Sequence, residues 1–210
     1  MTLDAQPNAG MQSDDASGSR PALSTEARSI LLGLARRSVD AAARGKPITP
    51  DFAEVAGVPE ILQPRACFVT LHSEGELRGC IGQLVARQPL WEAAMTNAQR
   101  AAVSDSRFTA VRPEELASLR IEISVLTPPK PLEFGSPEDL LGKLRPGIDG
   151  VVLHLGGSMS TFLPQVWEQL PSPQLFLDHL CRKAGLPERS WRNQPLEIQT
   201  YQVQYFKDKS

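Results

Sequence analysis

The 210-residue chain has no marked excess of charge of either sign. Lys and Arg total 22 against 24 Asp and Glu, which gives a formal net charge of −2. A chain with this balance presents no broad electrostatic attraction for nucleic acid or for an anionic membrane surface. The composition therefore disfavours nucleic-acid binding and argues against a membrane partner.

The sequence also lacks long apolar runs and any cysteine pattern that predicts disulfides. Runs such as Val151-Val152-Leu153 fall far short of the ~18 residues that indicate a membrane span. No basic segment followed by an apolar one stands at the N-terminus, so the sequence predicts no secretion. The three cysteines, Cys67, Cys80 and Cys181, form no C-x-x-C pair. We therefore expect reduced thiols in a cytoplasmic protein.

Familiar catalytic and cofactor motifs are missing as well. There is no Walker loop, dinucleotide fingerprint or G-x-S-x-G elbow, and no histidine pair has the H-x-x-x-H spacing of a zinc helix. His72 could reach the strand of Cys80 across a hairpin and form a Cys–His dyad, although a solvated turn histidine is the commoner outcome. The sequence predicts no metal site and identifies no cofactor.

What is present is enough apolar sequence for one folded domain, with or without a smaller lobe. Hydrophobic residues make up 41% of the chain, which suffices for a sizeable core. Residues 1 to 22 contain almost no large apolar side chains, so we predict a disordered tail there and a folded domain over residues 23 to 210. Interspersed helices and strands, with short hairpin turns, predict an α+β fold with mainly antiparallel sheets.

Periodicity and turn residues locate the expected elements. Helices are predicted over residues 24–45, 89–104, 165–170 and 173–184, and a further helix begins at Ser136. Strands are predicted over residues 66–71, 77–84, 119–126, 151–155 and 196–206. The last strand should contain a β-bulge near Gln199-Thr200, because its apolar residues change phase there. The proline-rich run 127–131 must be an irregular connection.

The best candidate for a functional site is the segment Leu77-Arg78-Gly79-Cys80-Ile81-Gly82. Two glycines three residues apart weaken a strand and mark a bulge or the close approach of another backbone or a ligand. Arg78 would favour the thiolate form of Cys80, and the N–H groups of Gly79 and Gly82 could bind an anion. The alternative is a buried cysteine in a tightly packed hairpin whose glycines serve only the bend, and the residues alone favour this alternative slightly.

A second candidate cluster is Asp105-Ser106-Arg107-Phe108, directly after a predicted helix. A carboxylate at a helix C-terminus opposes the helix dipole, so Asp105 is expected to have a partner elsewhere. A structural Asp–Arg pair is favoured over a catalytic acid. We also expect a carboxylate to hold Arg78, with Asp105 as the first candidate.

Taken together, these segments resemble the AMMECR family, which in bacteria is called AmmeMemoRadiSam system protein A. The resemblance rests on residues 77–82 and 105–108, on Ile-x-Ile-Ser-Val-Leu at 121–126 and on Gly-Ile-Asp-Gly at 147–150. It continues, in the same order, with Thr161-Phe162-Leu163-Pro164-Gln165-Val166-Trp167 and Lys183-Ala184-Gly185-Leu186. It covers residues 24 to 206 and leaves out the tail.

The resemblance implies an α+β fold in two unequal lobes, with both chain ends in the larger lobe and residues 77–82 at the groove between the lobes. It also implies association with a Memo-type protein, which resembles non-haem iron dioxygenases, and with a radical SAM protein. The candidate binding residues are Leu77, Arg78, Gly79, Ile81, Gly82, Asp105, Arg107, Phe108, Thr161 and Pro164.

Two functions from different classes stay open at this point. In the first, the chain is an enzyme in which Cys80 is the nucleophile or thiolate ligand, Arg78 lowers its pKa or binds an anion, and Asp105 with Arg107 positions the site. In the second, it is a partner or substrate-presenting module whose groove binds a peptide, a nucleotide or a small molecule. The second is favoured, because the sequence places no convincing base beside Cys80.

Overall fold

The computed structural model describes residues 22–49, 51–193 and 195–208. The fold is α+β, as predicted, and contains two four-stranded sheets in which all neighbouring strands are antiparallel. Apart from Ala22, the predicted N-terminal tail lies outside the described residues. Among the described residues, no helix is both long enough and apolar enough to cross a membrane.

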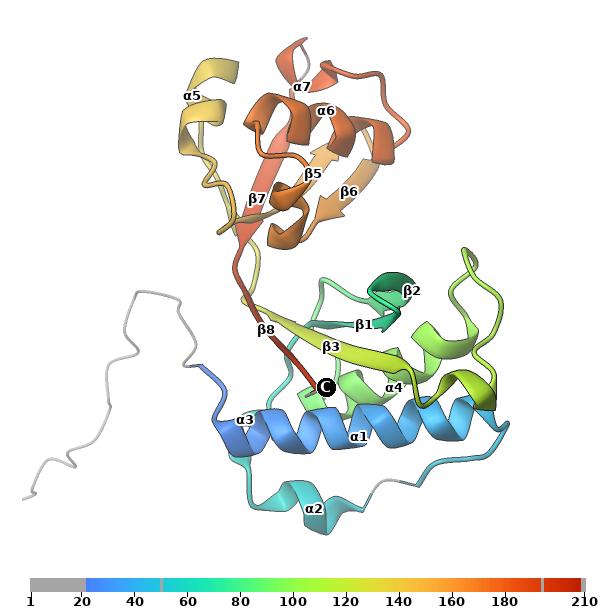
Figure 1. Ribbon diagram of the computed structural model, residues 1–210. Coiled ribbons are helices and arrows are strands. Elements are labelled where there is room, and N and C mark those ends of the chain that lie inside the picture. The colour runs from blue at the N-terminus through green and yellow to red at the C-terminus, as the bar shows by residue number, and fades with distance from the viewer. Residues whose placement is uncertain (1–21, 50, 194, 209–210) are drawn as a thin grey trace, which may run out of the picture.

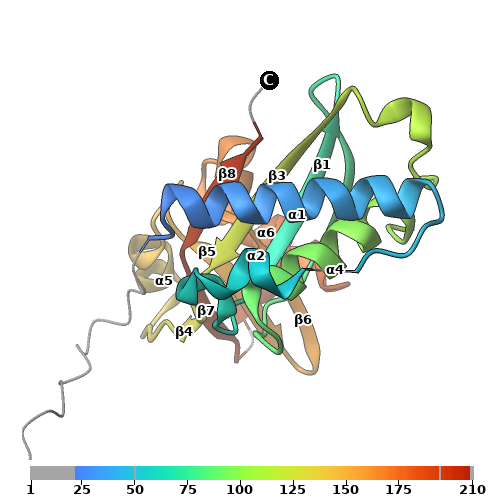
Figure 2. The same cartoon turned by 90° about the horizontal axis from the view of Figure 1, so that it is seen from below.

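The first sheet, called sheet I, has the strand order β2-β1-β3-β8. Its strands are β1 (Cys67–Ser73), β2 (Glu76–Gly82), β3 (Leu119–Leu126) and β8 (Val203–Lys207). Helices α1 (Thr25–Ala43) and α4 (Leu90–Val103) cover one face of this sheet (Figure 1), and Figure 2 shows α1 crossing over its strands. Two short helices, α2 (Phe52–Ala56) and α3 (Pro59–Leu62), and the 3₁₀ turn η1 (Pro113–Glu115) complete this part of the chain.

Local sequence explains the two long helices. The Ser24 hydroxyl caps α1 by accepting the Ala27 N–H at 3.1 Å, as the predicted N-cap requires. The apolar side of α1, including Leu31 and Leu34, is fully buried against α4 and sheet I. In α4 the buried residues are mostly alanines, which lets this helix approach the sheet closely.

The second sheet, called sheet II, has the strand order β4-β7-β5-β6. Its strands are β4 (Lys130–Pro131), β5 (Gly150–Leu155), β6 (Ser158–Phe162) and β7 (Glu197–Tyr201). Around it lie α5 (Pro137–Lys143), η2 (Pro164–Glu168), α6 (Pro173–Lys183) and α7 (Ser190–Asn193). Its separate core includes Trp167 and Phe176, whose rings stack with centroids 3.7 Å apart.

The two sheets meet at a third apolar cluster. Ala66 and Leu126 from sheet I and its flank pack there with Val152 and Tyr201 from sheet II. Beside this cluster, the Gln165 side chain donates a hydrogen bond to the Ser124 hydroxyl at 3.1 Å. Figure 1 shows that the connection after β3 and the passage from β7 to β8 join the two parts.

The C-terminal strand differs from the prediction of one bulged strand. It is two strands, because β7 pairs in sheet II, β8 pairs in sheet I, and Gln202 separates them. Ile198 points into the core beside α6, whereas Tyr201 lies in the cluster between the sheets. Both faces of β7 are therefore buried, which produces the change of apolar phase without a bulge.

Further differences concern short elements. The helix predicted over residues 165–170 is the 3₁₀ segment η2. The run 127–131 was predicted to be an irregular connection, but its last two residues form the short strand β4, which pairs with β7. No element was predicted for α2, α3, α7, η1 or β6, all of which are five residues or shorter. Segments of this length carry too few periodic positions to reveal their structure.

Candidate functional site

Cys80 lies on β2, the edge strand of sheet I, and its side chain faces sheet II rather than the helices. It pairs with Thr70 on β1, and the Thr70 hydroxyl donates to the Cys80 Sγ at 3.3 Å. The neighbouring residue Gly79 points the other way, toward Ala101 of α4. Cys80 is half-buried. The sulfur is thus part of the surface between the sheets and not of the helix-covered core.

The backbone of Cys80 is held by the Asp105–Arg107 pair that the sequence predicted. The Asp105 carboxylate accepts the Cys80 N–H at 2.8 Å, and Arg107 Nη2 donates to the Cys80 carbonyl at 3.4 Å. Arg107 also binds Asp105 through Nε at 3.0 Å and Nη2 at 2.7 Å. These side chains satisfy backbone groups that an edge strand otherwise exposes.

Asp105 is an ionised carboxylate whose two oxygens already accept hydrogen bonds, so it is not a free base. Its side chain is only 5% exposed, while that of Arg107 is 55% exposed. Hydrogen bonds from Arg107, with that from the Cys80 N–H, hold the pKa of Asp105 well below its usual range. A carboxylate with so low a pKa is a poor acceptor for the proton of the Cys80 thiol.

The Cys80 thiol is not activated in this environment. Burial raises its pKa above the usual value of 9.0, although the Thr70 hydroxyl and the Arg107 charge act in the opposite direction. The cation beside this thiol is Arg107, and the prediction that Arg78 fills this role is wrong. At neutral pH the group is therefore predominantly a thiol.

Arg78 is engaged elsewhere because it occupies a β-bulge. Leu71 pairs with Gly79 and His72 with Leu77, which leaves Arg78 as the extra residue of β2. Its guanidinium binds Glu115 through Nε at 2.8 Å and through Nη2 at 3.2 Å. The expected carboxylate partner is present, but it is Glu115 and not Asp105, which pairs with Arg107.

The Arg78–Glu115 pair should contribute measurably to stability. Both side chains are largely buried, so a double-mutant cycle with Arg78→Met and Glu115→Gln should give a coupling of ~1–3 kcal/mol in urea unfolding. Hydrogen bonds from Arg78 lower the pKa of Glu115 from 4.5 to about 2. The contribution of the ionised Glu115 to the free energy of unfolding is therefore complete above its unfolded pKa. It is lost as the pH falls from about 5 toward 2. If the losses of stability in the two single mutants are additive, and if their stability falls at low pH as that of the wild-type protein does, the pairing is contradicted.

The two glycines of the segment are explained by close packing. A Cβ on Gly79 would lie 2.3 Å from the Ala101 carbonyl oxygen of α4. A Cβ on Gly82 would lie 2.2 Å from the Phe68 ring. Neither glycine has a positive φ, so space and not backbone conformation requires them. This is the close approach of another chain segment that the sequence pattern predicted.

Sequence reasoning missed Lys183 at the end of α6. Its Nζ donates to the Thr161 carbonyl at 2.9 Å and lies 4.9 Å from the centroid of the Phe162 ring. The ammonium also interacts electrostatically with Cys80 and Arg107, so α6 brings a second cation to the thiol. Although the residue is exposed, desolvation lowers the pKa of Lys183. Lys183 belongs to a motif of the resemblance, and this was the available signal.

The remaining candidates lie at different distances from this cluster. Thr161 reaches it through Lys183, whereas Pro164 is buried at the start of η2 and lines a separate hollow. Phe108 lies beneath the Arg107 guanidinium and, with Arg78, lines a polar hollow of about 420 Å³.

The other residues of the segment have ordinary environments. Ile81 packs against the core of sheet I, and Leu77 is exposed at the start of β2. His72 stands opposite Leu77 and Arg120, while Cys80 stands opposite Thr70. The Thr70 hydroxyl is the hydrogen-bond partner of the Cys80 sulfur, and among the described residues no hydrogen bond joins His72 to it, so the considered Cys–His dyad is not formed.

Comparison with known proteins gives a consistent result. The sequence model of a family described as AMMECR1 matches residues 32–206. A protein from Methanothermobacter thermautotrophicus is 37% identical over 190 residues, which cover 88% of this chain and 95% of that protein. Protein MK0488 from Methanopyrus kandleri is 39% identical over 171 residues, which cover 78% and 76% of the two chains.

A solved structure extends this likeness to three dimensions. The crystal structure of uncharacterized protein PH0010 from Pyrococcus horikoshii superposes with a TM-score of 0.77 at 35% identity. The match covers 85% of this chain and 90% of that one. These three relatives are archaeal.

Proposed function

This chain belongs to the AMMECR1 family, and from that premise we propose that it is a non-catalytic partner or substrate-presenting module. In this proposal it is an AmmeMemoRadiSam system protein A, acts in the cytoplasm, and works with a Memo-type protein and a radical SAM protein. The surface between the sheets beside Cys80, together with the polar hollow at Arg78, receives the ligand or partner segment.

The state of Cys80 is the observation that carries this proposal. Its pKa is raised by burial, and the nearest carboxylate, Asp105, is committed to the Cys80 N–H and to Arg107. A cysteine nucleophile needs a lowered pKa or an adjacent base. Neither the thiol nor its neighbours meet that requirement, so recognition accounts for the cluster better than nucleophilic catalysis.

The charges of the cluster indicate the kind of ligand. Among the described residues no carboxylate forms an ion pair with Lys183, whose Nζ contacts only the Thr161 carbonyl and the Phe162 ring. Arg107 is half-exposed and electrostatically coupled to this lysine. Two neighbouring cations favour a carboxylate or phosphate group, such as that of an acidic peptide or a nucleotide.

Co-purification tests the proposed partnership. The chain should form a complex with the Memo-type protein of the same organism, with the tag on either protein. Lys183→Ala should weaken the complex about tenfold or more if the anionic contact is correct, as expected for loss of a charged hydrogen bond. Lys143→Ala, at an exposed lysine of α5, is the matched control. Absence of a complex at micromolar concentrations, with both proteins folded, would count against the proposal.

The alternative, an enzyme that uses the Cys80 thiolate, is favoured by the cations Arg107 and Lys183 near the sulfur. Alkylation by iodoacetamide separates the two functions. We expect slow labelling of Cys80 at pH 7, with a rate that still rises about tenfold per pH unit toward pH 9. Cys67, whose burial raises its pKa to about 12, should react only after unfolding. A Cys80 rate that reaches its plateau below pH 8 would restore the enzyme hypothesis.

A further inference from the structure

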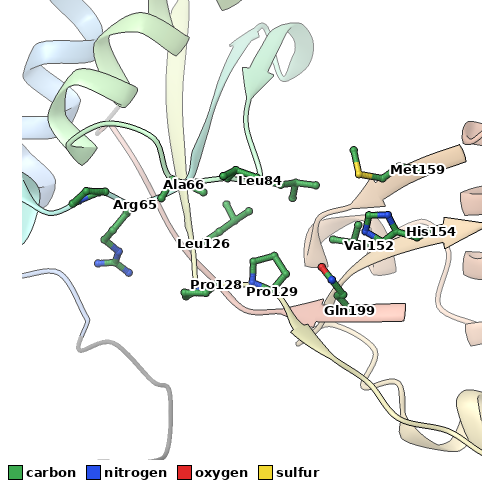
Figure 3. A pocket seen from close by; sticks show the side chains of 13 residues that line it. Arg65, Ala66, Leu84, Leu126, Pro128, Pro129, Val152, His154, Met159 and Gln199 are labelled. Atoms are coloured by element: carbon green, nitrogen blue, oxygen red, sulfur yellow. The ribbon is translucent and has the colours of Figure 1, made fainter. Parts of the chain in front are cut away.

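A cavity of about 370 Å³ opens where the ends of the two sheets meet (Figure 3). Its volume lies within the range of small-molecule sites in proteins, roughly 300–1,000 Å³. Leu84 and Leu126 line it from the side of sheet I, while Val152 and Met159 line it from sheet II. Cys80, Arg107 and Lys183 do not line this cavity. It is therefore a second concave feature, apart from the cysteine cluster.

Part of the cavity wall is stiff and apolar. Pro128 and Pro129 belong to the proline-rich connection that the sequence places after β3, and Figure 3 shows them between the two sheets. Proline has a fixed φ and no N–H, so this wall holds its shape and exposes no proline N–H donor to the cavity. Leu126 and Val152 are buried members of the inter-sheet cluster and anchor the floor. The cavity is thus preformed.

Two polar side chains face the cavity from neighbouring strands. Gln199 on β7 pairs with Val152 on β5, and His154 follows two residues later on the same face of sheet II. Figure 3 shows both side chains on the cavity side. Neither side chain makes a hydrogen bond with another described residue. Available hydrogen-bonding groups at one end of an apolar cavity are typical of a site that orients a ligand.

The rims supply large apolar side chains that a ligand would cover. Val85, in the irregular segment after β2, is 60% exposed, and Met159 on β6 is 57% exposed. Both line the cavity, Val85 from the segment that follows sheet I and Met159 from sheet II. Exposed apolar groups gathered around a concave surface mark a binding site more often than a chance arrangement.

We infer that this cavity binds a small, mostly apolar molecule with one polar end. The apolar body lies between the proline wall and the rims at Val85 and Met159. The polar end lies on sheet II, where Gln199 and His154 offer it hydrogen bonds. This assignment goes beyond the proposed function and does not depend on it.

Fluorescence titration of the full chain with N-phenyl-1-naphthylamine tests the assignment. The probe should bind saturably at one site per chain, with enhanced emission. Ala86→Trp, at an exposed cavity-lining position, should fill the space and weaken binding at least about tenfold. Val103→Trp, at an exposed position on α4 outside the cavity, should leave binding unchanged. Circular dichroism should show that both variants are folded.

The polar end is tested by displacing the probe with 2-naphthol and with 2-methylnaphthalene. In Gln199→Leu the ratio of the two displacement constants should shift at least about threefold toward the methyl compound, because a hydrogen bond is lost. An unchanged ratio would overturn the predicted role of Gln199. The small-molecule site would be overturned if the probe did not bind saturably, or if the two tryptophan variants bound it equally well. An apolar segment of another protein would then be the better candidate for the occupant of the cavity.

Discussion

Replacement of Gly79 by alanine is expected to destabilise the protein by ~3 kcal/mol or more. The new Cβ would lie 2.3 Å from the Ala101 carbonyl oxygen, a distance at which one of the two backbones must move. Neither backbone moves easily, because Ala101 belongs to the buried face of α4 and Gly79 is paired with Leu71 in sheet I. Overpacking of this kind costs about 1–3 kcal/mol when side chains can adjust, and more when backbone must shift.

Thermal unfolding should show this loss as a fall in Tm of roughly 6–12 °C. Gly142→Ala is the matched control, because nothing lies within 4 Å of the added methyl group and the residue is exposed in α5. Alanine is the better helix former, so this variant should be stabilised by up to ~1 kcal/mol. If Gly79→Ala has the same Tm as the wild-type protein, packing against α4 does not explain the glycine. A role in ligand binding then becomes the better account.

Loss of Arg107 should have the second large effect. Arg107→Met leaves the Asp105 carboxylate, which is 5% exposed, with only backbone N–H partners. Breaking a buried ion pair costs about 3–5 kcal/mol, and a cost of ~2–4 kcal/mol is expected here because solvent reaches the arginine side of the pair. Addition of Asp105→Asn should recover part of the loss, since asparagine removes the charge and keeps an acceptor for the Cys80 N–H.

The control for this prediction is an exposed ion pair of similar chemistry. Arg182 binds Glu188 at 3.2 Å with both side chains exposed, so Arg182→Met should cost less than ~1 kcal/mol. The pH dependence gives a second check. The pKa of Asp105 is lowered in the folded state, so its contribution is present above the unfolded pKa of about 3.9 and is lost as the pH falls below it. Arg107→Met should weaken this acid dependence, and a double mutant no more stable than Arg107→Met would contradict the pairing.

Local patterns determined most of the regular elements. The Ser24 cap and the apolar spacing of residues 27 to 34 specify α1, and the alternation from Leu119 to Leu126 specifies β3. These signals succeed because they depend on neighbours within a few residues of each other. The boundary between β7 and β8 was not predicted, because a change of sheet and a bulge both alter the apolar phase in the same way.

The sequence alone also determined which segment is unusual and why its glycines matter. The spacing of Gly79 and Gly82 indicates close approach, and the Asp105–Arg107 pair follows from a carboxylate placed at the end of a helix. Only the tertiary structure decided the partners across the chain. A bulge places Arg78 beside Glu115, and the packing of the two parts of the fold places Lys183 of α6 near Cys80. The choice of ion-pair partner and the pKa of a thiol depend on distances and on burial in the folded protein. Neither the distances nor the burial can be read from the order of the residues.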